Sequence, residues 1–407
     1  MFFVVLACLG SALEPELPSE PAPRAQPAKN LILIVLDTTR EDMLLQAATP
    51  TIDALAARGE RVERAWSGGT WTVPGVSSMM LGMPVRAHGW DLGSGRLGRY
   101  PPLPSEPLLA EVLQEQGFAT IGLHTNPYLA EELGFDRGFD VWRRVSDQIM
   151  ARELEKELAR TWSPDGRNFV YLHYIGPHSP VNPSEAQIQG LDLDASWYEG
   201  RGGMEIGVAK RGRLPGAREA YGQGYLGVLA DTDARLAQAL ALLEPYMEDS
   251  VVILTSDHGE MLGEQGVVGH GTWVHEPLTW VPYVAVGLGR SLPETLSTTA
   301  TPALVCQALG IAHDWPVQVD GPVVSQREGQ FSLLLGQEKG VWEPGEAPYS
   351  VDLSAAALGG SPQAPSAEML AAKTAFERAF PAAALPLGLV ELPAETQEQL
   401  KAMGYTE

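Results

Sequence analysis

Two apolar stretches of the chain each run into side chains that can bind a metal ion. Residues 251–255 are followed closely by Asp257 and His258, and residues 31–36 are followed by Asp37. A carboxylate beside an imidazole is a suitable ligand set for a divalent ion such as Zn²⁺ or Mn²⁺. Because open α/β sheets build their sites at the carboxyl ends of strands, we expect these three side chains to meet.

Both stretches have the composition of strands that are buried on both faces of a parallel sheet. Strand-like segments alternate with segments of helical spacing, which predicts an α/β fold with a mostly parallel central sheet covered on both faces. The predicted strands are 31–36, 119–123, 168–174, 251–255 and 283–286, and the main predicted helices are 51–61, 106–117, 148–161, 225–243 and 302–309. The periodicity weakens after about residue 325. We therefore predict a catalytic domain over 30–325 and a small, partly irregular C-terminal subdomain over 326–407.

The composition limits the classes of function. The chain has 407 residues and a formal net charge of −23, which argues against binding nucleic acid or anionic lipid through a basic face. An anionic substrate therefore needs a metal ion or local cations to attract it. The two cysteines, Cys8 and Cys306, exclude a disulfide framework, and Cys306 lies in an apolar helix-like run that is typical of an inert core thiol.

The N-terminal segment predicts export. Residues 1–8 form an apolar run that is too short to span a bilayer, and the stretch from Val5 to Cys8 is similar to the lipobox of bacterial lipoprotein signal peptides. We expect a periplasmic or outer-membrane-anchored bacterial lipoprotein whose only membrane contact is a lipid on Cys8. The sequence departs from this pattern in having no positive segment before the apolar run, and an ordinary secretory signal is the alternative. Residues 9–29 contain a Pro-, Glu- and Ala-rich stretch, which predicts a disordered tether.

Four stretches carry most of the polar residues that follow the predicted strands. They are LIVLDTTR at 33–40, WTVPGVSSMMLGMPVRAHG at 71–89, YLHYIGPHSP at 171–180 and TSDHGEMLGEQGVVGHG at 255–271. In this order and at these distances they resemble the sulfatase branch of the alkaline-phosphatase superfamily. Each motif alone is weak, whereas their collinear set is specific. The resemblance begins at Asn30 and is thin over 180–220 and 325–390.

The resemblance implies a three-layer α/β sandwich and a metal-dependent hydrolase or transferase of phosphate or sulfate esters. It implies one or two divalent ions (Zn, Mn, Ca or Mg), an anionic ester as substrate, and a nucleophile at the start of a helix. Carried over to this sequence, the metal ligands are Asp37, Thr72, Asp257 and His258, the catalytic residues are Thr72, His173, His178 and His270, and the substrate-binding residues are His124, Asn126 and Arg40.

The nucleophile motif departs from that of sulfatases. Their Cys or Ser, within C/S-x-P-x-R, is oxidised to formylglycine, whereas this chain has Thr72 and, in place of the arginine, Val76. Threonine is the nucleophile in the related phosphodiesterase-like and lipoteichoic-acid-synthase-like branches, so the expected reaction is phosphate-ester cleavage through Thr72. One alternative is a sulfate-ester hydrolase that works without formylglycine. The other is a catalytically degenerate envelope binding protein, which Val76 and the loss of an acidic residue at Gly176 favour.

The same residues also have structural interpretations. Thr72 is a good residue for capping a helix, and His173 is typical of a hydrogen-bonded histidine inside a strand. Arg40 is close in sequence to acidic residues with which it can pair. The structural and the functional interpretations predict different partners for each of these side chains.

Overall fold

The computed structural model describes residues 26–91, 99–199, 203–211, 214–354, 360–383 and 388–403. The predicted signal segment 1–8, with Cys8, and most of the predicted tether 9–29 lie outside the described residues. Within the described part of the chain, no helix is long and apolar enough to cross a membrane.

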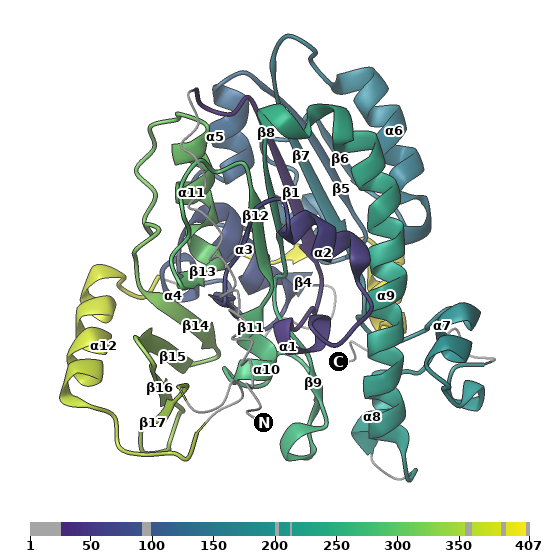
Figure 1. Ribbon diagram of the computed structural model, residues 1–407. Helices are drawn as coiled ribbons and strands as arrows, with labels where there is room; N and C mark the ends of the chain where they lie inside the picture. Colours follow the sequence, from purple (N-terminus) through teal and green to yellow (C-terminus); the bar gives the residue numbers. More distant parts are fainter. Residues whose placement is uncertain are drawn as a thin grey trace, which may run out of the picture.

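A seven-stranded sheet forms the centre of the molecule (Figure 1), with the strand order β2-β12-β8-β1-β7-β5-β6. The strands from β8 to β6 are parallel, whereas β12 and β2 complete one edge in antiparallel pairs. The sheet consists of β1 (Asn30–Leu36), β2 (Glu60–Arg61), β5 (Phe118–His124), β6 (Val141–Arg144), β7 (Arg167–Tyr174), β8 (Ser250–Thr255) and β12 (Tyr283–Val286). The predicted, mostly parallel sheet is confirmed.

Helices cover both faces of this sheet, as the continuous apolar strands require. Successive residues of β1 point to opposite faces, so Leu33 belongs to one apolar core and Ile34 to the other. The first core includes residues of α3 (Thr72–Leu81), α5 (Leu109–Glu115) and α11 (Thr301–Ala308). The second includes residues of α2 (Pro50–Ala56), α6 (Met150–Thr161) and α9 (Ala217–Leu243). The three layers are visible in Figure 1 and confirm the predicted sandwich.

Shorter elements connect these layers. A second sheet has the order β11-β3-β13, and two-stranded ribbons pair β9 with β10 and β4 with β18. The short strands are β3 (Arg64–Trp66), β4 (Arg99–Tyr100), β9 (Met261–Leu262), β10 (Val268–Gly269), β11 (Trp280–Val281), β13 (Thr295–Ser297) and β18 (Val390–Glu391). The remaining helices of the main body are α1 (Glu41–Leu44), α4 (Val85–His88), α7 (Glu185–Gly190), α8 (Ile206–Arg211), α10 (Glu276–Thr279) and α13 (Ala394–Ala402).

A four-stranded antiparallel sheet follows the main body, with the consecutive order β14-β15-β16-β17. Its elements are β14 (Val323–Arg327), β15 (Gln330–Leu335), β16 (Glu338–Trp342) and β17 (Tyr349–Asp352), with α12 (Ala367–Ala379) packed against it. This C-terminal sheet begins at Val323, and residues 390–402 lie apart from it, because β18 pairs with β4 of the main body. The predicted domain boundary at 326 remains a prediction.

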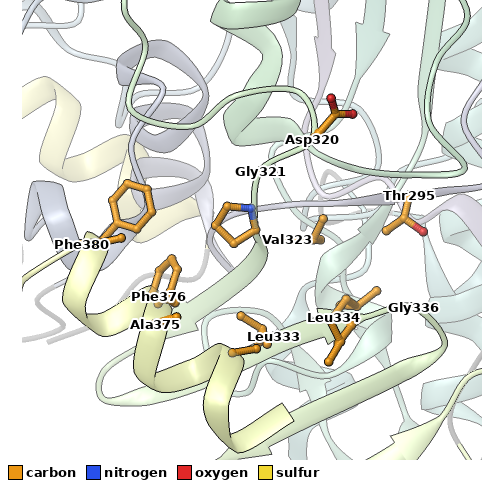
Figure 2. Close-up of a pocket in the computed structure, with 14 residues that line it drawn as sticks. Thr295, Asp320, Gly321, Val323, Leu333, Leu334, Gly336, Ala375, Phe376 and Phe380 are labelled. Atoms are coloured by element: carbon orange, nitrogen blue, oxygen red, sulfur yellow. The ribbon is translucent and has the colours of Figure 1, made fainter. Parts of the chain in front are cut away.

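An apolar cavity of about 520 Å³ lies between α12 and the C-terminal sheet. Figure 2 shows Phe376 and Phe380 on the α12 side of it and Leu333 and Leu334 on the sheet side. Asp320 is the one ionisable side chain among its described lining residues. None of the predicted metal ligands is among the described residues that line this cavity, so it is separate from the predicted site.

Candidate active site

Three ligand-bearing side chains meet where neighbouring strands of the central sheet end. Asp37 follows β1, Asp257 follows β8, and His173 lies near the end of β7. Because β1 pairs with both other strands, the register places Val35 opposite His173 on one side and Thr255 on the other. One ligand atom of each of the three residues lies within 4.8 Å of the others, and all three side chains are buried. The two predicted carboxylates are thus brought together.

Each of the two carboxylates has one oxygen that is hydrogen-bonded and one that is not. Asp37 Oδ2 accepts hydrogen bonds from Asn126 Nδ2 at 2.5 Å and from His173 Nε2 at 3.1 Å. Asp257 Oδ1 accepts from backbone N–H groups, including that of His258 at 3.0 Å. Asp37 Oδ1 and Asp257 Oδ2 are buried without a hydrogen-bond partner. An unsatisfied buried charge is strongly unfavourable, so these two oxygens indicate a place for a cation.

The imidazole of His258 faces the same place. Its Nδ1 donates to the carbonyl oxygen of Gly259 at 2.8 Å, which leaves the Nε2 lone pair directed at the carboxylates. Nε2 lies 3.6 Å from Asp37 Oδ1 and 3.6 Å from Asp257 Oδ2. Burial lowers the pKa of His258 to about 3, so the ring is neutral and available as a ligand. Two carboxylate oxygens and a neutral imidazole fit a divalent ion.

The pKa values of the two carboxylates move in opposite directions. Burial, with the nearby Asp37 carboxylate, raises the pKa of Asp257 well above its ordinary value. Burial opposes ionisation of Asp37 as well, but the hydrogen bond from His173 keeps the pKa of Asp37 below its ordinary value. Two carboxylates this close repel each other unless a cation lies between them.

Thr72 is the first residue of α3 and lies against this cluster. Its Oγ1 accepts a hydrogen bond from Asn126 Nδ2 at 3.0 Å and lies 3.5 Å from His258 Nε2. The Tyr128 N–H donates to Asn126 Oδ1 at 2.9 Å, which orients the amide so that its NH₂ group faces both Thr72 and Asp37. Asn126 therefore bridges the predicted nucleophile and the predicted metal ligand.

The start of α3 is shaped by its close approach to Asp257. A Cβ atom on Gly75 would lie 2.3 Å from the Asp257 carbonyl oxygen, so only glycine fits there. The residue that caps the helix is Trp71, with no side-chain capping hydrogen bond, which removes the interpretation of Thr72 as a simple helix cap. Val76, where the resemblance expects an arginine, is fully buried in an apolar core.

Two histidines hold the residues around the carboxylates. His173 donates from Nε2 to Asp37, while Tyr171 OH lies 2.8 Å from its Nδ1. His124 donates from Nδ1 to the Asn126 carbonyl oxygen at 3.0 Å, and its ring stacks on Trp142 with a centroid distance of 4.6 Å. Burial lowers the pKa of His124 to about 3. These contacts orient Asp37 and Asn126.

His178 and His270 form a second group beside His258. The ring centroid of His270 lies 5.0 Å from that of His178 and 4.6 Å from that of His258. His178 Nδ1 donates to the Ser179 carbonyl oxygen at 2.7 Å, and His270 Nδ1 lies 3.0 Å from Glu260 Oε2. Burial lowers the pKa of His270 to about 4 and raises that of Glu260 to about 7. Both shifts have one cause, since the charged form of each group loses its hydration.

The guanidinium of Arg40 is held in ion pairs. It donates to Asp42 at 2.8 and 3.0 Å, to Glu264 at 2.6 Å and to the Glu260 carbonyl oxygen at 3.0 Å. Burial opposes the charged form of Arg40, but Asp42 and Glu264 raise its pKa above the ordinary value. The structure therefore places Arg40 in the paired arrangement that its structural interpretation expects, and substrate binding by Arg40 remains a prediction.

Arg327 connects the C-terminal sheet to the loops on both sides of the site. Its Nη1 donates to Asp91 Oδ1 at 3.0 Å, which also accepts from Trp71 Nε1 at 3.2 Å. Its Nε donates to the Gly271 carbonyl oxygen at 2.7 Å. Trp71 precedes Thr72 and Gly271 follows His270, so one side chain supports two predicted catalytic positions.

Several of these residues were not predicted from the sequence. Glu260 lies two residues after His258, and Tyr171 two residues before His173, so the alternation of side chains along an extended segment offered a signal for both. For Arg327 there was none, because its partner Asp91 is 236 residues away.

Fold and site together define an α/β protein of the alkaline-phosphatase superfamily with a candidate metal site. A family model of sulfatases matches residues 29–301. The chain therefore belongs to the sulfatase family, whose members hydrolyse sulfate or phosphate esters with a divalent metal ion. A sequence relative is the low-salt glycan biosynthesis sulfotransferase Agl7 of Haloferax volcanii, 25% identical over 293 residues, or 67% of this chain. The chain spans only 58% of that protein's length.

Solved structures with the same fold cover most of the chain. Ps i-CgsB in complex with k-i-k-neocarrahexaose has a TM-score of 0.69 at 15% identity, over 93% of this chain and 98% of that one. Phosphonate monoester hydrolase of Agrobacterium radiobacter has a TM-score of 0.64 at 17% identity, over 87% and 94%. BT4656 in complex with D-glucosamine-2-N,6-O-disulfate has a TM-score of 0.62 at 13% identity, over 81% and 92%. At these identities the likeness shows the fold alone.

Proposed function

We propose that the protein is a metal-dependent hydrolase or transferase of phosphate esters that uses Thr72 as its nucleophile. The observation that carries this proposal is the position of Thr72 Oγ1. It lies at the start of α3, accepts from Asn126 at 3.0 Å, and faces the neutral ring of His258. A structural threonine has no need of such neighbours.

A divalent ion held by Asp37, Asp257 and His258 would supply positive charge that favours ionisation of the Thr72 hydroxyl and attracts the ester anion. Asn126 donates to Thr72 Oγ1 and stabilises negative charge on it. In the sulfatase motif that support is expected from the arginine that Val76 replaces, so Asn126 compensates for its loss. The free N–H groups at the start of α3 add to the attraction of the anion.

The transfer has two steps. Thr72 Oγ1 forms a bond to phosphorus as the bond to the alcohol oxygen breaks, and the hydroxyl proton passes to solvent. The departing alcohol oxygen takes up a proton from water, with His178 and His270, whose rings lie 5.0 Å apart, as neutral hydrogen-bonding partners. Water then cleaves the phosphothreonine in hydrolysis, or a second alcohol does so in transfer.

Sulfate-ester cleavage or sulfuryl transfer is the second candidate. It is favoured by the name of the Haloferax relative, a sulfotransferase, and by the disulfated ligand of BT4656. Sulfate and phosphate esters have the same tetrahedral anionic group, so the groups around Thr72 serve either reaction. A non-catalytic binding protein is the remaining alternative.

A panel of esters tests these proposals. Purified protein loaded with Zn²⁺ or Mn²⁺ is assayed on aryl phosphate diesters, phosphate monoesters and sulfates. We expect phosphate-ester turnover that Thr72→Ala lowers about a thousandfold or more, because the nucleophile is lost. Thr72→Ser retains a hydroxyl and serves as the matched control. Undiminished turnover in Thr72→Ala would remove the nucleophile assignment, and metal binding without turnover of any ester would favour the binding protein.

We further propose that the protein is exported and anchored by a lipid on Cys8. This rests on the lipobox-like residues 5–8 alone. We expect the wild type to incorporate labelled palmitate in a bacterial host and the Cys8→Ser variant to lose this labelling. Equal labelling of the wild type and the variant would contradict the proposal.

A further inference from the structure

A cleft of about 900 Å³ opens beside the site. His178 and Gly176 line it, and Thr125, which also lines it, precedes Asn126 in the chain. A Cβ atom on Gly176 would lie 3.6 Å from the backbone oxygen of Asp37. Because the predicted catalytic residue His178 lines it, the cleft borders the candidate site, and a substrate whose ester lies at Thr72 can extend into it.

Two arginines line the cleft. Arg144 comes from the end of β6 and Arg235 from α9. Asp147 and Glu395 are the carboxylates in its described lining, and His178 is the remaining ionisable group. The cleft is thus close to electrically neutral in a chain whose formal net charge is −23. An anion meets far less repulsion here than over the rest of the surface.

Arg235 is partly buried and its guanidinium has no hydrogen bond or ion pair with any residue that the structure describes. Its carboxylate neighbour is Asp147, with which it interacts electrostatically. The two oxygens of Asp147 accept from the backbone N–H groups of Ile175 and Gly176, at 3.1 and 3.2 Å, and none of the hydrogen bonds among the described residues joins them to Arg235. The donors of Arg235 are therefore available to a ligand.

Arg144 is held only weakly. Its Nη1 lies 3.5 Å from Thr396 Oγ1 and its Nη2 lies 3.7 Å from Glu395 Oε1, both on α13. The Glu395 side chain is 79% exposed, and such surface pairs contribute little to stability. A ligand anion can replace Glu395 at small cost.

Other arginines of the main body show a different pattern. Five of them have a carboxylate oxygen between 2.6 and 2.9 Å away, namely Arg40, Arg58, Arg61, Arg137 and Arg143. The contrast is clearest on β6, where Arg143 pairs with buried Glu157 at 2.9 Å while its neighbour Arg144 turns to the cleft. Neither cleft arginine has an ion pair this short among the described residues.

We propose that Arg144 and Arg235 form a subsite for a second anionic group of the substrate. The substrate class would then be an ester that carries at least two sulfate, phosphate or carboxylate groups, such as a multiply sulfated or phosphorylated saccharide. The inference rests on the proposed function, because the first group has to occupy Thr72. Guanidinium groups suit this task, since their planar donors bind such anions in pairs.

The test compares ligands that differ by one anionic group. Binding of D-glucosamine 2-N,6-O-disulfate and of glucosamine 6-sulfate is measured by calorimetry on the metal-loaded, full-length protein. We expect the wild type to bind the disulfate more tightly by about tenfold to a hundredfold. The variant Arg144→Met/Arg235→Met should reduce this preference to about twofold or less. Arg152→Met, which removes an exposed arginine of α6, should leave the preference unchanged.

The ratio of the two affinities distinguishes loss of the subsite from misfolding, because misfolding reduces the binding of both ligands to the same extent. Glu395→Gln is a second variant, and it should strengthen disulfate binding by freeing Arg144. Equal affinity of the wild type for both ligands, or a preference that survives the double substitution, would overturn the inference. Because binding is measured directly, failure of the subsite is distinguished from failure of the proposed reaction, which would appear as absent turnover in the ester panel.

Discussion

The central sheet and the C-terminal sheet of this protein are built on opposite principles. The central sheet is mostly parallel and buried on both faces, and its strand ends carry Asp37, His173 and Asp257. The C-terminal sheet is antiparallel, with consecutive strands and α12 packed against it. It provides none of the candidate metal ligands found among the described residues. The comparison indicates that the central sheet carries the candidate ligands, whereas the C-terminal sheet contacts the loops around them.

Two cationic side chains of the C-terminal sheet form hydrogen bonds to the main body. Lys339 of β16 is fully buried, and its Nζ donates to the Val274 carbonyl oxygen at 2.7 Å and to Glu276 at 3.0 Å. Arg327 of β14 donates to the Gly271 carbonyl oxygen and to Asp91, which in turn accepts from Trp71. Three predictions test whether the two sheets divide their work in this way.

The largest expected effect is on stability, from Lys339→Met. The substitution leaves Glu276 buried without its partner, which should lower the free energy of unfolding by about 3–5 kcal/mol. Denaturant unfolding followed by circular dichroism measures it. The double variant Lys339→Met/Glu276→Leu removes both charges and should recover most of the loss. A single variant as stable as the wild type would show that this buried pair does not hold the two sheets together.

The second prediction concerns metal binding to the central sheet. A divalent ion at a hundredfold excess over its Kd should raise the free energy of unfolding by about 2.7 kcal/mol, because it binds only the folded site. Asp257→Asn should abolish this gain, whereas Lys339→Met should retain it, since Lys339 contributes no ligand. Thermal unfolding with Zn²⁺, Mn²⁺, Ca²⁺ or Mg²⁺, each against a chelator control, gives the measurement. An unfolding temperature that none of the four ions changes would contradict the metal site.

The smallest expected effect is on turnover, from Arg327→Met. We expect kcat to fall about tenfold, because Asp91, which accepts from Trp71, and the loop of Gly271 lose a shared hydrogen-bond donor, so the reacting groups are held less well. The increase in the free energy of unfolding on metal binding should stay unchanged. This result would distinguish a loss of positioning of the reacting groups from a general loss of folded structure. Arg327→Lys keeps the charge but loses the paired geometry and should lie between the two. Unaltered kcat in Arg327→Met would limit the C-terminal sheet to a structural role.

The sequence predicted the central sheet and the two carboxylates at its strand ends because the signals were local. A run of buried residues followed by a carboxylate occurs at both Asp37 and Asp257, and each can be read from fewer than ten residues. The three-layer fold followed from the alternation of such runs with helices, and the structure confirms it.

The sequence was less informative wherever a role depends on distant partners. Arg40 carries the same charge as Arg144 and Arg235, yet Arg40 is enclosed by Asp42 and Glu264 while the other two face a cleft. Asn126 was expected near the substrate, but its bridge between Asp37 and Thr72 spans 89 and 54 residues. No local pattern records such distances.

The sequence by itself determined the main strands of the central sheet and the polar residue types at their ends, because strand burial and side-chain alternation are properties of neighbouring residues. Only the tertiary structure decided which donors remain available. Asp37 Oδ1 and Asp257 Oδ2 are left without hydrogen bonds, Arg235 is left without a short ion pair among the described residues, and Arg327 is placed between two loops. These outcomes depend on contacts between segments far apart in the chain, where packing, and not local sequence, fixes the partner of each polar group.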